Sequence, residues 1–336
     1  MRAVRWHGRG DVRLDEVATP APHGTEVLIR VEAAAICGTD VDEVRRGPIT
    51  VPVQPHPVSG RSAPMTLGHE IVGIVEAGGG ASGPAIGARV APWPSSPCGR
   101  CEDCLAGHAN RCPRTVALGM SADGGMADYL LVEAAACVPI GAEVPPERAV
   151  LVEPFAVALH AVHQIPLAGR RVAVVGIGSL GLCVVEAAIQ AGAVEVVALS
   201  RSDAGRELAR EVGAADALAL NCAADVRADI VFETAGAGPA IAASLAAVRR
   251  GGRVLVLGGH PDPTAVDLLD LTVREVGLEG SVSHCFADFT QAAAAITRGT
   301  LARARRPVTL APLRAGPSLL GVADGSTKRI LMPGLS

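Results

Sequence analysis

Four cysteines lie close together between residues 98 and 112 of the sequence. They follow the pattern C-x2-C-x2-C-x7-C and are Cys98, Cys101, Cys104 and Cys112. Four thiolates that leave no coordination position open are typical of a structural zinc site, which holds a loop in shape. A four-cysteine iron–sulfur cluster uses the same type of ligand, so the spacing leaves that alternative open. The total of nine cysteines is odd and fits a disulfide framework poorly.

A second set of metal-binding side chains is spread along the first half of the sequence. Cys37 lies in AAAICGTDVDE, and His69 and Glu70 lie in TLGHEIVG. Glu153 lies in VLVEPFAVALHAV, where a carboxylate is costly to bury unless it meets a cation or a metal. One thiolate, one imidazole and one carboxylate would leave a fourth zinc position for water or substrate. Taken singly, each residue could equally be an ordinary core or loop residue.

A glycine-rich segment predicts a dinucleotide site. VAVVGIGSLG has GxGxxG spacing, follows an apolar strand pattern and precedes a helical one. Gly176 permits the tight turn, Gly178 lets the backbone approach a pyrophosphate, and Gly181 lets the helix pack on the strand. The helix N-terminus would donate N–H groups to the phosphates. The predicted cofactor-binding residues of this segment are Gly176, Gly178, Ser179, Leu180 and Gly181.

The end of the following strand indicates which cofactor is bound. NAD-binding segments carry an Asp or Glu about 20 residues on, which accepts hydrogen bonds from the ribose hydroxyls. VEVVALSRS ends instead in Ser200 and Arg201, which can donate to and pair with a 2′-phosphate. The nearby Asp203 lies past the expected end of the strand. The sequence therefore favours NADP(H) over NAD(H), with the alternative that Arg201 is an ordinary solvated residue.

The hydrophobic pattern changes near the middle of the chain. The first 150 residues hold short alternating segments such as EVLIRVEAAAI, and the Pro-rich segment 47–64 predicts a loop. From residue 170, short Val- and Ile-rich segments alternate with helical ones, which predicts a parallel sheet covered on both faces. The sequence thus predicts the α/β fold class, with a doubly wound parallel sheet beside a mainly β region.

Composition argues against several classes of protein. The formal net charge is −4 and aromatic residues make up 2% of the chain, which argues against nucleic-acid binding. No apolar run suits a membrane span and the N-terminal segment lacks an apolar signal region, so we expect a cytoplasmic protein with no membrane partner. Among 30 Lys and Arg residues, Lys328 is the only lysine, a bias that we interpret as a property of the coding sequence.

The motifs taken together resemble a known family. In chain order, CGTD, GHE, the four-cysteine segment, VEP and VGIGSLG resemble the zinc-dependent medium-chain dehydrogenase/reductase family of alcohol and polyol dehydrogenases. GPITVPVQPHPVSGRSAPMTLGHE and LVEPFAVALHAV are most similar to butanediol dehydrogenase-like members. The resemblance implies a GroES-like catalytic domain over residues 1–153, completed by 288–336, and a Rossmann dinucleotide-binding domain over 154–287. It also implies a homodimer or homotetramer.

The resemblance also implies roles for individual residues. Cys37, His69 and Glu153 would bind a catalytic zinc ion, and the four clustered cysteines would bind a structural one. Thr39 would relay the substrate proton. Glu70 would be an exchanging ligand or a neighbour of the ligands, so which of the two glutamates binds zinc in the resting state stays open.

The implied reaction is reversible hydride transfer between NADP(H) and a secondary alcohol, vicinal diol or cyclic polyol, or the matching ketone. Two residues depart from the family pattern. Asp42 stands where members often have His, and Ser200 stands where butanediol dehydrogenases usually have Asp. The alternative functions are a zinc-independent double-bond reductase of the same fold, a zinc-ribbon binding protein and an inactive cofactor-binding protein.

Overall fold

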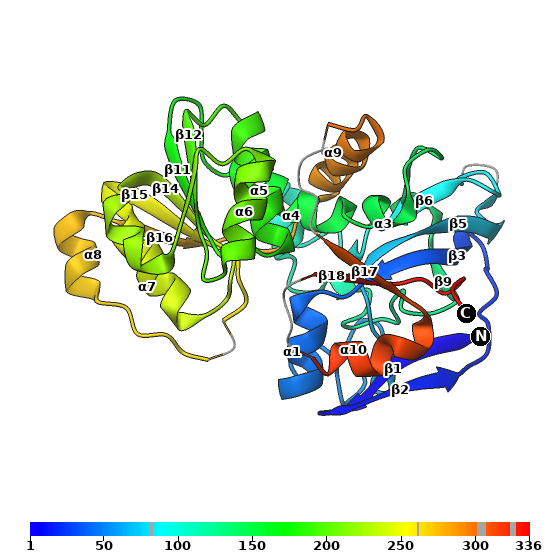
Figure 1. Ribbon diagram of the computed structural model, residues 1–336. Coiled ribbons are helices and arrows are strands. Elements are labelled where there is room, and N and C mark those ends of the chain that lie inside the picture. The colour runs from blue at the N-terminus through cyan, green and yellow to red at the C-terminus, as the bar shows by residue number, and fades with distance from the viewer. Residues whose placement is uncertain (81–82, 261, 301–306, 323–326) are drawn as a thin grey trace. The chain divides into compact units, whose positions relative to one another are not determined.

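The protein is built from two compact units. This computed structural model describes residues 1–80, 83–260, 262–300, 307–322 and 327–336. The first unit comprises Met1–Glu153, Cys285–Thr300 and Pro307–Ser336, and the second contains Pro154–His284. Figure 1 labels most of the helices and strands of both units. Within the described ranges, no helix is long and apolar enough to cross a membrane.

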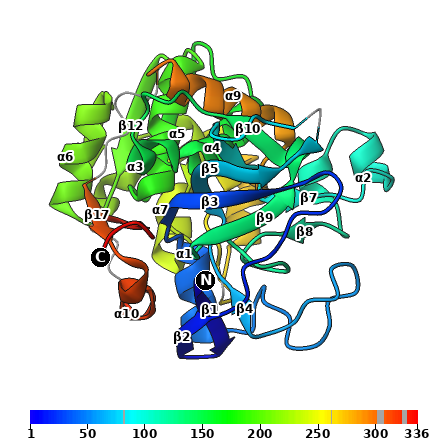
Figure 2. The same ribbon diagram turned by 90° about the vertical axis from the view of Figure 1, so that its right-hand side faces the viewer.

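The first unit contains a seven-stranded sheet, counted over the described residues. Its strand order is β10-β6-β5-β3-β18-β17, and β9 also pairs with β3. Figure 2 shows β5, β3 and β9 side by side, in agreement with their antiparallel pairing. The strands are β3 (Glu26–Ala35), β5 (Glu70–Gly78), β6 (Arg89–Pro92), β9 (Tyr129–Glu133), β10 (Cys137–Pro139), β17 (Val308–Ala311) and β18 (Lys328–Leu331).

Smaller elements complete this unit. A three-stranded sheet has the order β2-β1-β4, and β7 pairs with β8, again among the described residues. These strands are β1 (Arg2–Gly8), β2 (Asp11–Glu16), β4 (Met65–Thr66), β7 (Ser95–Ser96) and β8 (Val116–Ala117). The α-helices are α1 (Gly38–Arg46), α2 (Glu102–Leu105), α3 (Pro146–Ala149), α9 (Phe286–Thr297) and α10 (Gly316–Leu320).

The register of β3 with its neighbours places the side chains of the predicted catalytic site. β3 pairs with β5 so that Ala35 lies opposite Glu70, and it pairs with β18 so that Ala35 lies opposite Ile330. The Ala-rich end of β3 is completely buried and leads directly to Cys37, the N-cap residue of α1. Three segments that are distant in the sequence therefore meet at one end of β3.

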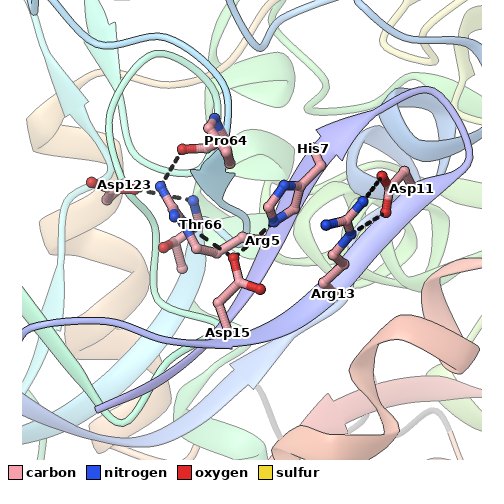
Figure 3. Close-up of polar contacts among 8 residues, drawn as sticks. All are labelled: Arg5, His7, Asp11, Arg13, Asp15, Pro64, Thr66 and Asp123. Carbon is pink, nitrogen blue, oxygen red and sulfur yellow. Dashed lines mark hydrogen bonds and ion pairs between the residues drawn. The ribbon is translucent and has the colours of Figure 1, made fainter.

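The predicted loop at residues 47–64 contains neither helix nor strand and is attached at both ends. The buried Glu43 carboxylate accepts hydrogen bonds from the backbone N–H groups of Ile49, at 3.0 Å, and Thr50, at 2.6 Å. At the other end, Arg5 donates to the carbonyl oxygen of Pro64 (Figure 3).

A second polar group holds the segment that follows this loop. The Asp123 carboxylate accepts from the backbone N–H of Thr66 at 3.0 Å, as Figure 3 also shows. On the neighbouring hairpin, His7 and Asp15 form a side-chain contact of 2.8 Å. These contacts hold the chain in place immediately before His69.

The second unit contains a six-stranded sheet, counted over the described residues, in which all pairs are parallel. Its order is β13-β12-β11-β14-β15-β16. The strands are β11 (Arg171–Val175), β12 (Glu195–Leu199), β13 (Asp216–Leu218), β14 (Ala228–Glu233), β15 (Val248–Val256) and β16 (Gly277–Gly280). The helices are α4 (Val152–His163), which begins at the end of the first unit, α5 (Ser179–Gln190), α6 (Asp203–Val212), α7 (Gly238–Ala247) and α8 (Leu268–Arg274).

This strand order confirms the predicted doubly wound sheet. The chain runs outward from β11 through β12 to β13, and then returns to β14 on the other side of β11. The Val-rich strands are buried along most of their length, as expected for a parallel sheet with helices on its faces. In such sheets the ligand binds outside the carboxyl ends of the strands, where the strand order reverses.

Candidate metal centres and dinucleotide site

The four predicted structural-zinc cysteines lie together in the first unit. The sulfur atoms of Cys98, Cys101, Cys104 and Cys112 all lie within 4.8 Å of one another. The short β7–β8 pair brings Ser96 opposite Val116 and so closes the base of the cysteine lobe, which we define as residues 97–115. Within the lobe, Gly99 adopts a φ of 68°, which turns the chain between the first two cysteines.

The backbone of the lobe stabilises negative charge on the Cys98 sulfur, whereas burial raises the pKa of the Cys104 thiol to about 12. The N–H of Cys98 donates to the sulfur of Cys112 at 3.3 Å. The backbone N–H groups of Arg100 and Cys101 help to lower the pKa of the Cys98 thiol to about 6. Thiolates are the form that binds zinc, so the four donors and their surroundings fit a closed tetrahedral zinc site.

A second group of metal-binding atoms forms at the end of β3. The sulfur of Cys37, a ring nitrogen of His69 and a carboxylate oxygen of Glu70 lie within 4.8 Å of one another. His69 and Glu70 are buried, whereas Cys37 is half-buried. One thiolate, one imidazole and one carboxylate are a donor set that suits an open zinc site. Thr39 lies on the first turn of α1, with its hydroxyl oxygen 3.7 Å from the Cys37 sulfur.

Asp40 holds this group in position from behind. Its side chain is almost completely buried and accepts a hydrogen bond from the backbone N–H of Cys37 at 2.8 Å. Its other oxygen lies 3.7 Å from Nδ1 of His69. Burial opposes the charged form of His69, but Asp40 and Cys37 outweigh this effect and raise the pKa of the imidazole well above its usual value. Because a zinc ligand must be neutral imidazole, metal binding would displace that proton.

Lys328 joins the group although the sequence analysis assigns it no role. Its ammonium group is buried and contacts the two carboxylate oxygens of Glu70 at 2.7 and 2.5 Å. It also donates to the carbonyl oxygen of Ile36 at 3.3 Å. Burial opposes the charged ammonium, but Glu70 and Cys37 outweigh this effect and raise the pKa of Lys328. The one signal for this residue in the sequence is that it is the only lysine.

Glu153 and Asp42 lie outside the 4.8 Å group of donors among the described residues. Glu153 is half-buried in the first turn of α4, where its charge raises the pKa values of His69 and Lys328, after the larger effects of burial and of nearer charges. Glu70 is thus the carboxylate whose oxygen lies within 4.8 Å of the Cys37 and His69 donor atoms, and Glu153 is a second carboxylate whose charge acts on His69. Asp42 is half-buried on α1.

The predicted glycine motif forms the turn between β11 and α5. Gly176 adopts a φ of 97°, and a Cβ atom there would lie 2.8 Å from the backbone nitrogen of Ala235. A Cβ atom on Gly181 would lie 2.0 Å from the carbonyl oxygen of Gly176. Gly178 is the N-cap residue of α5, and Ser179 and Leu180 form its first turn. This strand, glycine turn and helix N-terminus are the arrangement that suits a pyrophosphate.

Ser200 and Arg201 follow β12 directly, as predicted. Ser200 is buried, whereas Arg201 is exposed. Arg206 on α6, which no sequence motif indicated, donates to the carbonyl oxygen of Ser200 at 2.9 Å and pairs with Asp203. Position 206 lies one helical turn after the N-cap of α6, so helix periodicity could have indicated that this guanidinium faces the strand end.

Comparisons with known proteins agree with this architecture. Family models for the alcohol dehydrogenase GroES-like domain and the zinc-binding dehydrogenase match residues 23–142 and 179–298. An L-threonine 3-dehydrogenase of Paraburkholderia phytofirmans is 33% identical over 284 residues, which cover 80% of this chain and 79% of that protein. The (R,R)-butanediol dehydrogenase of Bacillus subtilis is 30% identical over 302 residues, with coverages of 84% and 85%.

A solved structure is also similar over nearly the whole chain. A zinc-binding dehydrogenase from Sinorhizobium meliloti, crystallised with bound NADP, is 31% identical, with a TM-score of 0.87 and 99% of each chain covered. The two family models and these relatives identify an oxidoreductase of the zinc-binding dehydrogenase type. The chain belongs to the zinc-dependent medium-chain dehydrogenase/reductase family, which confirms the resemblance and the predicted fold class.

Proposed function

We propose that this protein is an alcohol dehydrogenase or ketone reductase that transfers hydride between NADP(H) and a secondary alcohol, vicinal diol or cyclic polyol. The observation that carries the proposal is the group of Cys37, His69 and Glu70 donor atoms within 4.8 Å of one another. The relatives named for L-threonine and (R,R)-butanediol support a small secondary alcohol with a polar group on the next carbon.

Different residues of the first unit would bind the metal ions, accept the substrate proton and position the ligands. Cys37 and His69 would hold a catalytic zinc ion together with Glu70 or Glu153, and the cysteine lobe would hold a second, structural ion. When bound, the catalytic ion supplies Lewis-acid chemistry, which lowers the pKa of a substrate hydroxyl. Thr39 would accept the proton of that hydroxyl and pass it outward. Asp40 orients His69, and Lys328 balances the charge of Glu70.

The residues after β12 support a preference for NADP(H). Ser200 can donate a hydrogen bond to a 2′-phosphate, and Arg201 can pair with it. Arg206 adds a second guanidinium at the same strand end. The bound NADP of the Sinorhizobium meliloti structure is consistent with this reading. We infer that residues 154–287 form the dinucleotide-binding domain and that residues 1–153 with 288–336 form the catalytic domain.

The test is a steady-state assay of zinc-loaded protein with NADPH and NADH. The substrates are small hydroxyketones, cyclic polyol ketones and, in the oxidative direction, L-threonine and butanediols. We expect turnover with NADPH to exceed turnover with NADH by about tenfold or more, since a phosphate–guanidinium pair contributes roughly 1.5–3 kcal/mol. R201A should reduce this preference without losing turnover with NADH.

Other outcomes would correct the proposal in defined ways. A preference for NADH would overturn the cofactor assignment and leave the dehydrogenase assignment intact. Turnover of activated double bonds that survives removal of zinc would favour the zinc-independent reductase.

A further inference from the structure

A completely buried carboxylate stands at the carboxyl end of the parallel sheet. Glu233 is the last residue of β14 and has no exposed surface. One carboxylate oxygen accepts the backbone N–H groups of Ala235, at 2.8 Å, and Gly236, at 2.9 Å. The other oxygen lies 2.9 Å from Nε2 of His260. Glu233 thus connects the segment after β14 with the segment after β15.

Both segments also pack closely on their neighbours. The Thr234 hydroxyl donates to the carbonyl oxygen of Val175, at 3.2 Å, at the end of the strand that precedes the glycine motif. A Cβ atom on Gly258 would lie 2.2 Å from the backbone nitrogen of Gly236 and 2.8 Å from the Glu233 carboxylate. Because these backbones approach so closely, His260 is held in a fixed place relative to the glycine turn.

The strand order indicates which part of the cofactor reaches this place. A dinucleotide crosses a doubly wound sheet at the point where the strand order reverses, with the pyrophosphate at the helix after the first strand. The adenosine ribose then lies at the end of β12, beside Ser200. The nicotinamide half must lie on the other side of β11, over the ends of β14 and β15, which carry Glu233 and His260.

The carboxylate orients the imidazole as well as anchoring it. With Nε2–H directed at Glu233, the remaining ring nitrogen, Nδ1, is available to another partner. Nδ1 has no partner within the described part of the chain, and the ring is 15% exposed. A ribose hydroxyl suits this position because a hydroxyl both donates and accepts, and so pairs with Nδ1 in either protonation state.

We propose that His260 binds a ribose hydroxyl of the nicotinamide half of the cofactor through Nδ1, and that Glu233 is the positioning residue that aims the ring. This inference rests on the proposed use of a nicotinamide dinucleotide. It assigns the two residues to cofactor binding and leaves the chemistry of hydride transfer to the cofactor and the zinc site.

Two substitutions of His260 separate cofactor contact from structural support. In H260Q, the amide keeps a donor near the position of Nε2 and so keeps the contact with Glu233, but nothing replaces Nδ1. In H260N, the amide lies near the position of Nδ1 and the contact with Glu233 is lost. We expect H260Q to be the more stable of the two and H260N to bind NADPH more tightly. H260Q should raise the Kd for NADPH about three- to tenfold, the effect of one lost hydrogen bond.

The measurements are thermal unfolding and fluorescence titration with NADPH and with 2′,5′-ADP, which carries the adenosine half alone. The Kd for 2′,5′-ADP should stay unchanged in both variants. E233Q, which keeps an acceptor for Ala235 and Gly236, should weaken NADPH binding less than H260Q does. E211Q, which changes an exposed carboxylate on α6, is the matched control and should change neither Kd.

Two results would overturn the proposal: an equal loss of affinity for NADPH and 2′,5′-ADP in the His260 variants, or tighter NADPH binding by H260Q than by H260N. Either would show that the Glu233–His260 contact only stabilises the fold. The wild-type titration tests the proposed cofactor preference separately. If wild type binds NADH more tightly than NADPH, that preference fails and the His260 comparison is made with NADH and ADP. If wild type binds neither dinucleotide, both proposals are overturned.

Discussion

The two groups of metal-binding side chains are built in opposite ways. The cysteine lobe takes all four of its donors from residues 98–112, and local turns and the two-residue β7–β8 pair bring them together. The Cys37 group takes its donors from two segments, and its charge partner Lys328 from a third near the end of the chain. The lobe is a local structure, whereas the Cys37 group exists only because three strands pair in the correct register.

The two groups also balance their charge differently. In the lobe, backbone N–H groups donate to the sulfur atoms of Cys98 and Cys112. In the Cys37 group, a buried ammonium group already neutralises one carboxylate. We therefore expect the lobe to need a metal ion for its stability and the Cys37 group to fold without one.

The largest expected effect separates the two groups by activity and stability. C37S should lower kcat about 10³-fold or more, because several kcal/mol of Lewis-acid stabilisation depend on that metal. C37S should leave the unfolding temperature close to that of wild type, whereas C101S should lower the unfolding temperature strongly. Zinc content, steady-state kinetics and thermal unfolding measure these outcomes. Each variant should retain one of two zinc ions, and a C37S protein that unfolds as readily as C101S would end the distinction.

The next effect concerns the buried ion pair. K328M should lower the free energy of unfolding by about 3 kcal/mol, because it leaves the Glu70 charge buried without its partner. The double variant E70Q/K328M should recover most of that loss, since neither charge remains. K328R, which keeps the charge, is the control. Urea unfolding of K328M, E70Q/K328M and K328R, each compared with wild type, measures these free energies. A K328M protein as stable as wild type would show that Glu70 needs no charged partner.

A smaller effect is expected for thiol reactivity in zinc-free protein. The pKa of Cys98 is lowered to about 6, whereas burial raises that of Cys137 to about 12. The thiolate fraction of Cys98 therefore rises between about pH 5 and 7 and then levels off, while Cys137 stays protonated at pH 7. At pH 7, alkylation of Cys98 should therefore be faster than alkylation of Cys137 by about tenfold or more, as measured by peptide mass spectrometry. Zinc should protect Cys98, and equal rates would contradict the difference.

The smallest effect tests the backbone of the lobe. Gly99 has a φ of 68° with open space where a Cβ atom would lie, so G99A should cost about 1 kcal/mol through backbone strain alone. Gly38, beside Cys37, also has open space and no left-handed φ, and G38A is therefore the matched control. Thermal unfolding of zinc-loaded protein should show a loss for G99A alone. Equal losses would mean that the turn between the lobe cysteines carries no special constraint.

The features that the sequence predicts correctly are those with local signals. The glycine motif is recognised because an apolar strand precedes it and a helical pattern follows it within a few residues. The four-cysteine segment is recognised for the same reason, since its donors are neighbours in the chain. Family membership follows from these motifs in their order, and the comparisons confirm it.

The sequence by itself therefore determined the family and the two kinds of unit, and it predicted a set of donor residues. Only the tertiary structure decided that Glu70 joins the Cys37 and His69 donor atoms, that the single lysine pairs with it and that Glu233 contacts His260. Each of these contacts joins segments whose pairing depends on strand register. A one-residue shift in register would send every side chain of a strand to the opposite face, and no pattern within one segment specifies its partner.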